Sequence, residues 1–291
     1  MKERQWQADV AVVGSGPGGA TVARELSRAG KRVVLLEMGR DWRRNPLYGT
    51  YTGCLLYTDK GGMLFSEEGL NIIRGILTGG STNLYCGTAS RPPEWLKKKY
   101  GVDTDECVDQ TIEELRIRPL PAELMGKSSL RVLEAANELG LGWEPYPKFM
   151  DPDRCPHGFD CGADCMLGCR CKAKWTANEY LDQARVAGCT LVTRARVEEV
   201  IIEGGVAAGV RGRLGRRRPF SVRAGTVVLC AGGLGDPLIL QRSGFPEAGR
   251  GLLMDPTIMV YGVHRGEGTS TAPPMAVGSY DDTHGFILSH L

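Results

Sequence analysis

Three glycines near the start of the chain have the spacing of a nucleotide-binding loop. Gly14, Gly16 and Gly19 form the pattern G-x-G-x-x-G directly after the apolar run Val10 to Val13, which suits a buried parallel strand. In such a loop the first glycine permits a tight turn and the second lets a pyrophosphate approach the backbone. The third lets the following helix pack closely on the strand. The spacing therefore predicts a dinucleotide-binding site.

A helix, a second strand and an acidic residue follow the loop in the order that a βαβ unit requires. The helical pattern ends at Gly30, and the apolar strand Val33 to Leu36 leads to Glu37. Glu37 lies 23 residues after Gly14, close to the roughly 20 residues that precede a ribose-binding carboxylate. We therefore expect Glu37 to bind ribose hydroxyls. The alternative is a glycine-rich turn in an ordinary βαβ unit.

The composition limits the classes of function. A chain of 291 residues suits about two domains. The balance of 36 basic and 34 acidic residues, a net charge of +2, gives no basis for nucleic-acid binding. No apolar stretch reaches the roughly 18 residues of a membrane span, and the N-terminal sequence MKERQWQADVAVV contains no signal-peptide apolar region. We therefore expect a cytoplasmic protein without a membrane span, whose ten cysteines are thiols or metal ligands.

Five of the cysteines are concentrated in 17 residues and could bind a metal centre. They are Cys155, Cys161, Cys165, Cys169 and Cys171, spaced C-x5-C-x3-C-x3-C-x-C. Iron–sulfur clusters are held by thiolates, and closely spaced cysteines on a loop can surround one cluster. Zinc sites usually contain C-x2-C pairs, which this segment lacks. An iron–sulfur cluster, unliganded structural thiols, and zinc or disulfides all stay open as interpretations.

The other segments supply the elements that must position these residues. A small polar loop, Gly79 to Asn83, is suited to lie against a flat ring system. Helices are predicted at 104–116 and 121–139 and from about Pro237, and the segment after Gly188 has a β-rich pattern. Its predicted strands are 190–194, 197–202, 206–211, 219–223 and 226–230.

Four segments, in this order along the chain, resemble the glucose-methanol-choline (GMC) oxidoreductases. They are VVGSGPGGATVARELSRAGKRVVLLEMG, RGILTGGSTN, TRARVEEVIIEGGVAAGV and VVLCAGGLGDPLILQRSGF. The second is similar to the family's R-G-x-x-x-G-G-S loop over the flavin, and the fourth to its A-G-x-x-x-S-P-x-x-L-x-x-S-G signature. In the fourth segment Asp236 stands where the family has serine. The likeness extends over nearly the whole chain.

The resemblance implies FAD as cofactor and a CH–OH group as hydride donor, in an alcohol or sugar-like substrate. The reaction it implies is hydride transfer from the carbinol carbon to the flavin while a base removes the hydroxyl proton. Together with the loop analysis, it implies the following cofactor-binding residues: Gly14, Ser15, Gly16, Gly18, Gly19, Glu37, Gly79, Gly80, Ser81, Asn83, Val197, Ala231 and Gly232.

The cysteine segment CGADCMLGCRCKAKW resembles a narrower branch of the family, the sugar and sugar-acid dehydrogenases. That resemblance implies a 3Fe–4S or 4Fe–4S cluster, held by the five cysteines, that passes electrons to an acceptor protein. The spacing matches only in part, because Cys165 and Cys169 fit while the earlier ligand is either Cys155 or Cys161.

The family's catalytic histidine has no counterpart in its expected context. Family members run to roughly twice this length, and that histidine lies near their C-terminus. The chain has four histidines, His157, His264, His284 and His290, and none stands in the family's catalytic context. We therefore assign no catalytic residue and expect a second polypeptide to complete the substrate domain. Two alternatives stay open: a non-catalytic FAD-binding or electron-transfer subunit, and a flavoprotein that reduces C=C bonds.

These inferences combine into an α/β fold. We expect a Rossmann-like FAD-binding domain with a β-meander, built from residues 1–100 and 172–250. Residues 101–171 form a helical and cysteine-rich insertion, and residues 251–291 begin a β-sheet substrate domain. The apolar stretch Phe286 to Leu288 is predicted to be a strand with an exposed edge, which favours pairing with a strand of another polypeptide.

Overall fold

The chain divides into two compact units, each built from two separate segments. The computed structural model describes residues 2–155, 164–253, 255–262, 273–281 and 284–290. The first unit comprises Met1–Asn83 and Thr176–Val260, and the second Leu84–Trp175 and Tyr261–Leu291. Residues 84–100 and 172–175, which we assigned to the FAD-binding domain, lie in the second unit, and residues 251–260 lie in the first.

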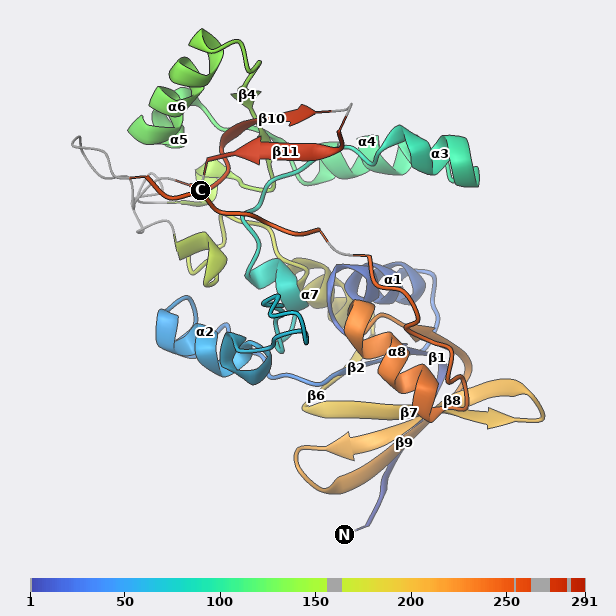
Figure 1. The fold of residues 1–291 in the computed structure, drawn as a ribbon. Helices are drawn as coiled ribbons and strands as arrows, with labels where there is room; N and C mark the ends of the chain where they lie inside the picture. Colours follow the sequence, from blue (N-terminus) through green and yellow to red (C-terminus); the bar gives the residue numbers. More distant parts are fainter. Residues whose placement is uncertain (1, 156–163, 254, 263–272, 282–283, 291) are drawn as a thin grey trace. The chain divides into compact units, whose positions relative to one another are not determined.

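A six-stranded mixed sheet forms the centre of the first unit (Figure 1). Its strand order is β6-β2-β1-β9-β8-β7, in which β6, β2, β1 and β9 run parallel and β9, β8 and β7 form an antiparallel meander. The strands are β1 (Arg4–Val13), β2 (Val33–Glu37), β6 (Thr190–Thr193), β7 (Ala195–Glu203), β8 (Val206–Leu214) and β9 (Arg218–Leu229). The predicted Rossmann-like α/β fold with a β-meander is thereby confirmed.

The helices of the first unit are α1 (Pro17–Arg28), α2 (Tyr51–Tyr57), α7 (Asn178–Val186) and α8 (Gly232–Arg242), with short 3-10 turns η1 (Asp59–Gly62) and η2 (Gly80–Asn83). Helix α1 packs on β1 and β2 and against α7, α8 packs on β7, and α2 contacts η1. The shared core consists of small and β-branched side chains, which allow close packing between layers. Its buried members are Ala8, Ala11, Val13, Val34, Leu36, Ala195, Val197, Val210, Phe220, Val222, Ala224 and Ile239.

Strand β9 belongs to both halves of the sheet. We predicted separate strands at 219–223 and 226–230, with a break near Gly225, but the structure has one strand from Arg218 to Leu229. Its first half pairs with β8, and from Phe220 onward it also pairs in parallel with β1. Pairing with β1 on both sides of Gly225, at Ala224 and Thr226, holds the backbone extended there, so the strand is not interrupted.

The second unit contains short helices and two small sheets. Its helices are α3 (Glu94–Tyr100), α4 (Asp105–Glu114), α5 (Ala122–Met125) and α6 (Lys127–Glu138), with 3-10 turns η3 (Pro152–Arg154) and η4 (Asp164–Met166). One sheet has the order β11-β10-β4 and the other pairs β3 with β5. The strands are β3 (Arg118–Pro119), β4 (Glu144–Pro145), β5 (Pro147–Lys148), β10 (Val277–Asp281) and β11 (Phe286–Ser289).

Two predicted helices differ from those in the structure. The helix predicted at 121–139 is two helices, because Gly126 between α5 and α6 has φ of 81°, a conformation outside any helix. Helix α8 begins at Gly232 rather than near Pro237, which lies inside it. Among the described residues, no helix is both long and apolar enough to cross a lipid bilayer.

Candidate functional site

The glycine loop between β1 and α1 takes the shape that its spacing predicts. Gly14 has φ of 96°, and a Cβ at this position would overlap the carbonyl group of Cys230. A Cβ on Gly19 would overlap the carbonyl oxygen of Gly14. Gly16 differs, because a Cβ there would meet nothing within 4 Å. Gly14 and Gly19 are therefore required by the packing of the protein itself, whereas Gly16 borders open space where a phosphate could bind.

Helix α1 begins at this loop and presents its N-terminus to the same space. Gly16 is the N-cap residue, with no side-chain hydrogen bond, and Pro17 is the first residue of the helix. The first turn contains no acidic residue. The N–H groups of the first turn and the helix dipole therefore offer an unneutralised positive end, which favours a bound phosphate.

Glu37 ends β2 as a buried carboxylate that accepts hydrogen bonds on both oxygens. Its exposed fraction is 7%. Oε2 accepts the N–H of Ser15 at 3.1 Å and its hydroxyl at 2.5 Å, and Oε1 accepts the N–H of Gly39 at 2.6 Å. Burial raises the pKa of Glu37, while the hydrogen bonds from Ser15 and Gly39 oppose the rise. The carboxylate is thus held toward the loop that would bind the cofactor.

The second glycine loop packs directly against the first. A Cβ on Gly80 would lie 3.0 Å from the Cα of Gly16, and Gly80 has φ of 55°. Gly79 donates its N–H to the hydroxyl of Ser15 at 3.2 Å. A side chain on Gly79 would meet the Asn178 amide nitrogen at 2.6 Å. Gly80 is therefore needed for the two loops to approach each other, and Gly79 for the second loop to pack against Asn178.

Asn83 lies behind this second loop and shapes it from within the protein. It is fully buried, and its amide nitrogen donates to the carbonyl oxygens of Thr78 at 3.0 Å and Gly80 at 2.8 Å. Its side-chain oxygen accepts from the Tyr48 hydroxyl at 2.8 Å and the Asn178 amide at 3.2 Å. Since protein groups occupy its donors and acceptors, Asn83 affects a cofactor through the shape of the loop.

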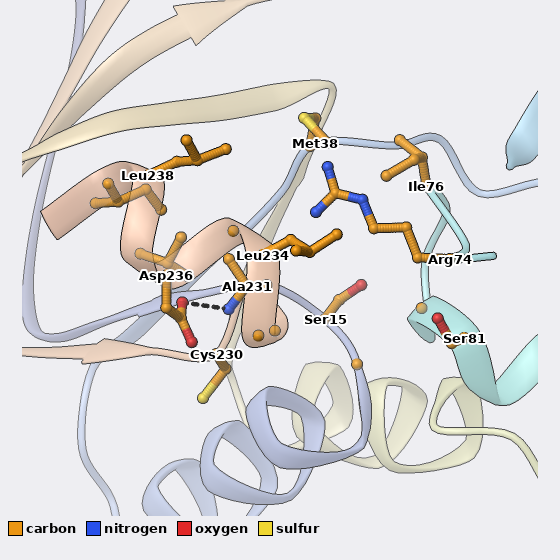
Figure 2. Close-up of a pocket in the computed structure, with 18 of the residues that line it drawn as sticks. Ser15, Met38, Arg74, Ile76, Ser81, Cys230, Ala231, Leu234, Asp236 and Leu238 are labelled. Carbon is orange, nitrogen blue, oxygen red and sulfur yellow. Dashed lines mark hydrogen bonds between the residues drawn. The ribbon is translucent and has the colours of Figure 1, made fainter. Parts of the chain in front are cut away.

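The end of β9 and the start of α8 form the opposite wall. Asp236 Oδ1 accepts the N–H of Ala231 at 2.7 Å, the bond drawn in Figure 2. Burial raises the pKa of Asp236. This carboxylate, at the position where the family has serine, therefore caps the first turn of α8.

These segments enclose a cavity of about 620 Å³. In Figure 2, Arg74, Ile76 and Ser81 lie on one side of it, and Ala231, Leu234 and Asp236 on the other. Ten predicted cofactor-binding residues line it, and Gly19, Gly79 and Asn83 do not. The ten are Gly14, Ser15, Gly16, Gly18, Glu37, Gly80, Ser81, Val197, Ala231 and Gly232. A largely apolar cavity between two glycine loops and two helix N-termini suits a dinucleotide such as FAD.

Three arginines that we did not predict also line the cavity. They are Arg74, Arg196 and Arg242, and Arg74 forms an ion pair with Asp59 at 2.6 Å. Arg74 opens the R-G-x-x-x-G-G-S motif, so the sequence contained a signal for it, whereas nothing in the sequence singled out the other two. The described part of the chain thus places three cations beside the predicted cofactor site.

Three sulfur atoms of the cysteine segment lie close to one another. Cys171 Sγ lies 3.5 Å from Cys155 Sγ and 3.6 Å from Cys169 Sγ. Burial raises the pKa of Cys171 to about 12. Cys165 is buried nearby, and Cys161 lies outside the described residues. Within the parts that the structure describes, no group of His, Cys, Asp or Glu could hold a metal ion. The described cysteines therefore give no support to the predicted iron–sulfur cluster.

The two described histidines belong to the second unit. His284 has a largely exposed side chain, and its Nδ1 lies 3.0 Å from Asp281 Oδ2. His290 lies between the hydroxyl groups of Ser128 and Ser129, at 3.1 and 3.3 Å, and burial lowers its pKa. Their environments identify neither as a catalytic base. His157 and His264 lie outside the described residues.

Two family models match the chain. A model described as GMC oxidoreductase matches residues 54–257, and one described as FAD binding domain matches residues 7–50. Together they cover both walls of the cavity.

Proteins with known sequences and structures show the same likeness. An uncharacterized GMC-type oxidoreductase of Mycobacterium tuberculosis is 34% identical over 277 residues, covering 88% of this chain and 43% of that protein. The long-chain-alcohol oxidase FAO4B of Arabidopsis thaliana is 26% identical over 284 residues, covering 88% of this chain and 37% of that one. The crystal structure of pyridoxine 4-oxidase from Mesorbium loti shares the fold, with a TM-score of 0.59 and 23% identity, over 85% of this chain and 55% of that one. The chain spans less than half the length of the two sequence relatives.

Proposed function

Because the chain belongs to the GMC oxidoreductase family, we propose that it is the FAD-binding part of an oxidoreductase that oxidises CH–OH groups. The observation that carries this proposal is the cavity between the two glycine loops. One of its walls contains an open Gly16 and the N-terminus of α1, and Glu37 is held beside them. When FAD is bound, its isoalloxazine ring supplies the hydride acceptor.

The residues of this chain bind and orient the cofactor. The α1 N-terminus and Gly16 would hold the pyrophosphate, and Glu37 the adenosine ribose. Val197, which is 7% exposed, offers an apolar surface for the adenine. The loop of Gly80 and Ser81 would lie along the flavin end. The chain thus fixes the position of the redox group and leaves the proton chemistry to other residues.

We propose that the group which removes the hydroxyl proton comes from a second polypeptide or a further part of the protein. Two facts support this. The relatives extend well beyond the matched region, and β11 is an edge strand with exposed apolar side chains. Phe286, Ile287 and Leu288 are 45%, 47% and 40% exposed. Such an edge favours pairing with another strand.

The proposal extends to the substrate, the location and the onward path of electrons. The family resemblance implies an alcohol or sugar-like substrate, and a cytoplasmic location is the expectation from the N-terminal sequence. An iron–sulfur cluster and a protein electron acceptor are supported only by the cysteine spacing. Anaerobically purified protein with about three or four irons per chain would support the cluster, and less than one iron per chain would contradict it.

The proposed function is tested by adding flavin and then substrate. The purified chain should bind one FAD, measured by quenching of flavin fluorescence. Without the second polypeptide it should not reduce that flavin with simple alcohols or sugars. Co-expression with a polypeptide matching the remaining part of the relatives should restore reduction, read at the flavin absorbance band. Absence of FAD binding would contradict the cofactor assignment. Turnover by the chain alone at about 1 per second or more would contradict the proposed second polypeptide.

A further inference from the structure

Ser15 connects the two loops of the cavity through one hydroxyl group. Its side chain has no exposed surface. The hydroxyl donates to Glu37 Oε2 at 2.5 Å and accepts the N–H of Gly79 at 3.2 Å. A hydroxyl can donate one hydrogen bond and accept others, so both contacts form at the same time. One buried atom therefore links the carboxylate after β2 with the glycine loop before η2.

The same bonds determine what Glu37 can offer to a ligand. A carboxylate has about four acceptor positions, and the N–H and hydroxyl of Ser15 and the N–H of Gly39 take up three of them. The carboxylate is therefore oriented and charge-stabilised before a cofactor arrives. Met38 also donates a backbone hydrogen bond to it, so a ribose hydroxyl would compete with one of these donors.

We propose that Ser15 is a positioning residue that holds the Glu37 carboxylate ionised and fixes the Gly79 loop at the distance that FAD requires. The proposal rests on FAD being the cofactor. Without the Ser15 hydroxyl, Glu37 Oε2 loses its shortest hydrogen bond and the buried N–H of Gly79 loses its acceptor. The first loss affects the carboxylate of Glu37, and the second affects the Gly79 loop.

The Ser15 hydroxyl should also affect how FAD binding depends on pH. Burial raises the pKa of Glu37 and the Ser15 hydroxyl is the strongest group opposing the rise, so its removal should raise that pKa further. The charged residues lining the same cavity are Arg74, Arg196, Arg242 and Asp236. The causes acting on Glu37 are burial and hydrogen bonds. FAD binding through the carboxylate should therefore weaken at a higher pH in the variant than in the wild type.

The test compares Ser15→Ala with Thr21→Ala as a matched control. Thr21 is also on the α1 side of the loop, but its hydroxyl donates only to the Pro17 carbonyl at 2.7 Å. We expect Ser15→Ala to weaken FAD binding about tenfold at pH 7.5, the equivalent of 1.4 kcal/mol. The pH midpoint at which FAD binding is lost on acidification should also rise. Thr21→Ala should change neither. Flavin fluorescence titrations from pH 5 to 8 measure both quantities.

The cofactor-free protein supplies a second readout that does not depend on FAD. Below the ordinary pKa of glutamate, Glu37 is protonated in both the folded and unfolded states, so Ser15→Ala should cost little stability through Glu37. As pH rises toward 7, the folded variant holds a less well stabilised carboxylate, so the loss in Tm relative to wild type should grow. A role in packing alone would give a loss that does not change with pH.

The outcomes separate this inference from the proposed function. If wild type binds FAD and Ser15→Ala has the same affinity and pH midpoint, the Ser15 inference is overturned and the cofactor assignment stands. A pH-independent loss in both readouts also overturns it. If wild type does not bind FAD, the proposed function fails. The pH dependence of the Tm difference then still shows whether the Ser15 hydroxyl stabilises the Glu37 carboxylate. If Ser15→Ala does not fold, Ser15→Cys replaces it. Because a thiol is a weaker hydrogen-bond donor, this variant should show smaller changes of the same sign in FAD affinity, pH midpoint and Tm.

Discussion

Each compact unit buries ionisable groups, but the two units use them differently. In the first, Glu37 is surrounded by N–H and O–H donors and lines the cavity. In the second, Lys148 and Lys174 are 0% and 2% exposed and donate mainly to backbone carbonyls. The carboxylate borders a cavity, whereas the ammonium groups connect segments of their own unit. Burial of a charge therefore indicates a binding site only where the group also borders a cavity.

Lys148 shows the structural use most clearly. Its Nζ lies within hydrogen-bonding distance of the carbonyl oxygens of Cys86 at 2.9 Å, Pro274 at 2.7 Å and Met275 at 3.2 Å, and of the Thr88 hydroxyl at 2.8 Å. Residues far apart in the sequence thus meet at one nitrogen atom. Lys174 similarly joins the carbonyl groups of Tyr85 and Cys165.

The largest effect is expected at the cavity. Gly16→Val should weaken FAD binding at least a hundredfold, about 2.7 kcal/mol, because its side chain occupies the space where the pyrophosphate must lie. The Tm of the cofactor-free protein should be nearly unchanged, since a Cβ at Gly16 meets nothing within 4 Å. Gly19→Val is the contrasting variant and should fail to fold, because its Cβ overlaps the Gly14 carbonyl. Equal losses of Tm in both variants would contradict the distinction between them.

An effect of similar size is expected in the second unit, on stability alone. Lys148→Met keeps the length of the side chain but leaves buried carbonyl groups without a donor, at a cost of roughly 2–3 kcal/mol in free energy of unfolding. FAD affinity should be unaffected when measured below the new Tm. Calorimetry and flavin titration together test this, and Lys60→Met, at an exposed position, is the control. Weakened FAD binding in the Lys148 variant would contradict the claim that Lys148 serves only the stability of the second unit.

A smaller effect should appear as pH rises. Burial lowers the pKa of Lys148 and Lys174 to about 8, against 10.5 when unfolded. The unfolded chain therefore binds more protons between pH 8 and 10.5, so stability should rise as pH increases through 8. From pH 7 to 9 the gain is about 1 kcal/mol per lysine. Above pH 9 the buried thiols oppose it, because burial raises the pKa of Cys86 and Cys171. Urea midpoints at pH 7, 8 and 9 measure the slope, which Lys148→Met should reduce.

The smallest effect is expected at an ion pair on the surface of the first unit. Arg43 bonds Asp41 and Asp182, each at 2.6 Å, so it is not free to bind a cofactor phosphate. Asp182→Asn should lower stability by less than about 1 kcal/mol and should leave FAD affinity unchanged. A tenfold change in FAD affinity would show that this pair also shapes the cavity.

The first unit could be predicted well because its requirements are local. Gly14 and Gly19 are needed for backbone shape, and that need is visible in residue type and spacing. Val197 was predicted from the family likeness and Ala231 from the small residues that follow an apolar strand, and both line the cavity. Arg196 and Arg242 line the cavity because of the direction in which their side chains point once the sheet and α8 have packed. No local sequence pattern indicates that direction.

The second unit could be predicted less well because its pattern is compositional. Five cysteines in a short segment suggest a metal, but only the fold decides the sulfur–sulfur distances. The structure brings Cys155, Cys169 and Cys171 into contact without a metal-holding group among the described residues. The buried role of Lys148 also gives no sequence signal, because lysine is usually exposed.

The position of β9 has a consequence for how the protein is made. Strand β1 is synthesised long before β9, its partner on one side, with Arg4 pairing to Phe220 and Val13 to Leu229. The whole first segment of the second unit is translated between them. The pairing is therefore among the most distant in the chain, and its loop-closure entropy makes it slow to form. The glycine loop after β1 must wait for most of the chain before its far wall exists. FAD can therefore bind only late in folding, and free cofactor would favour completion of the sheet by mass action.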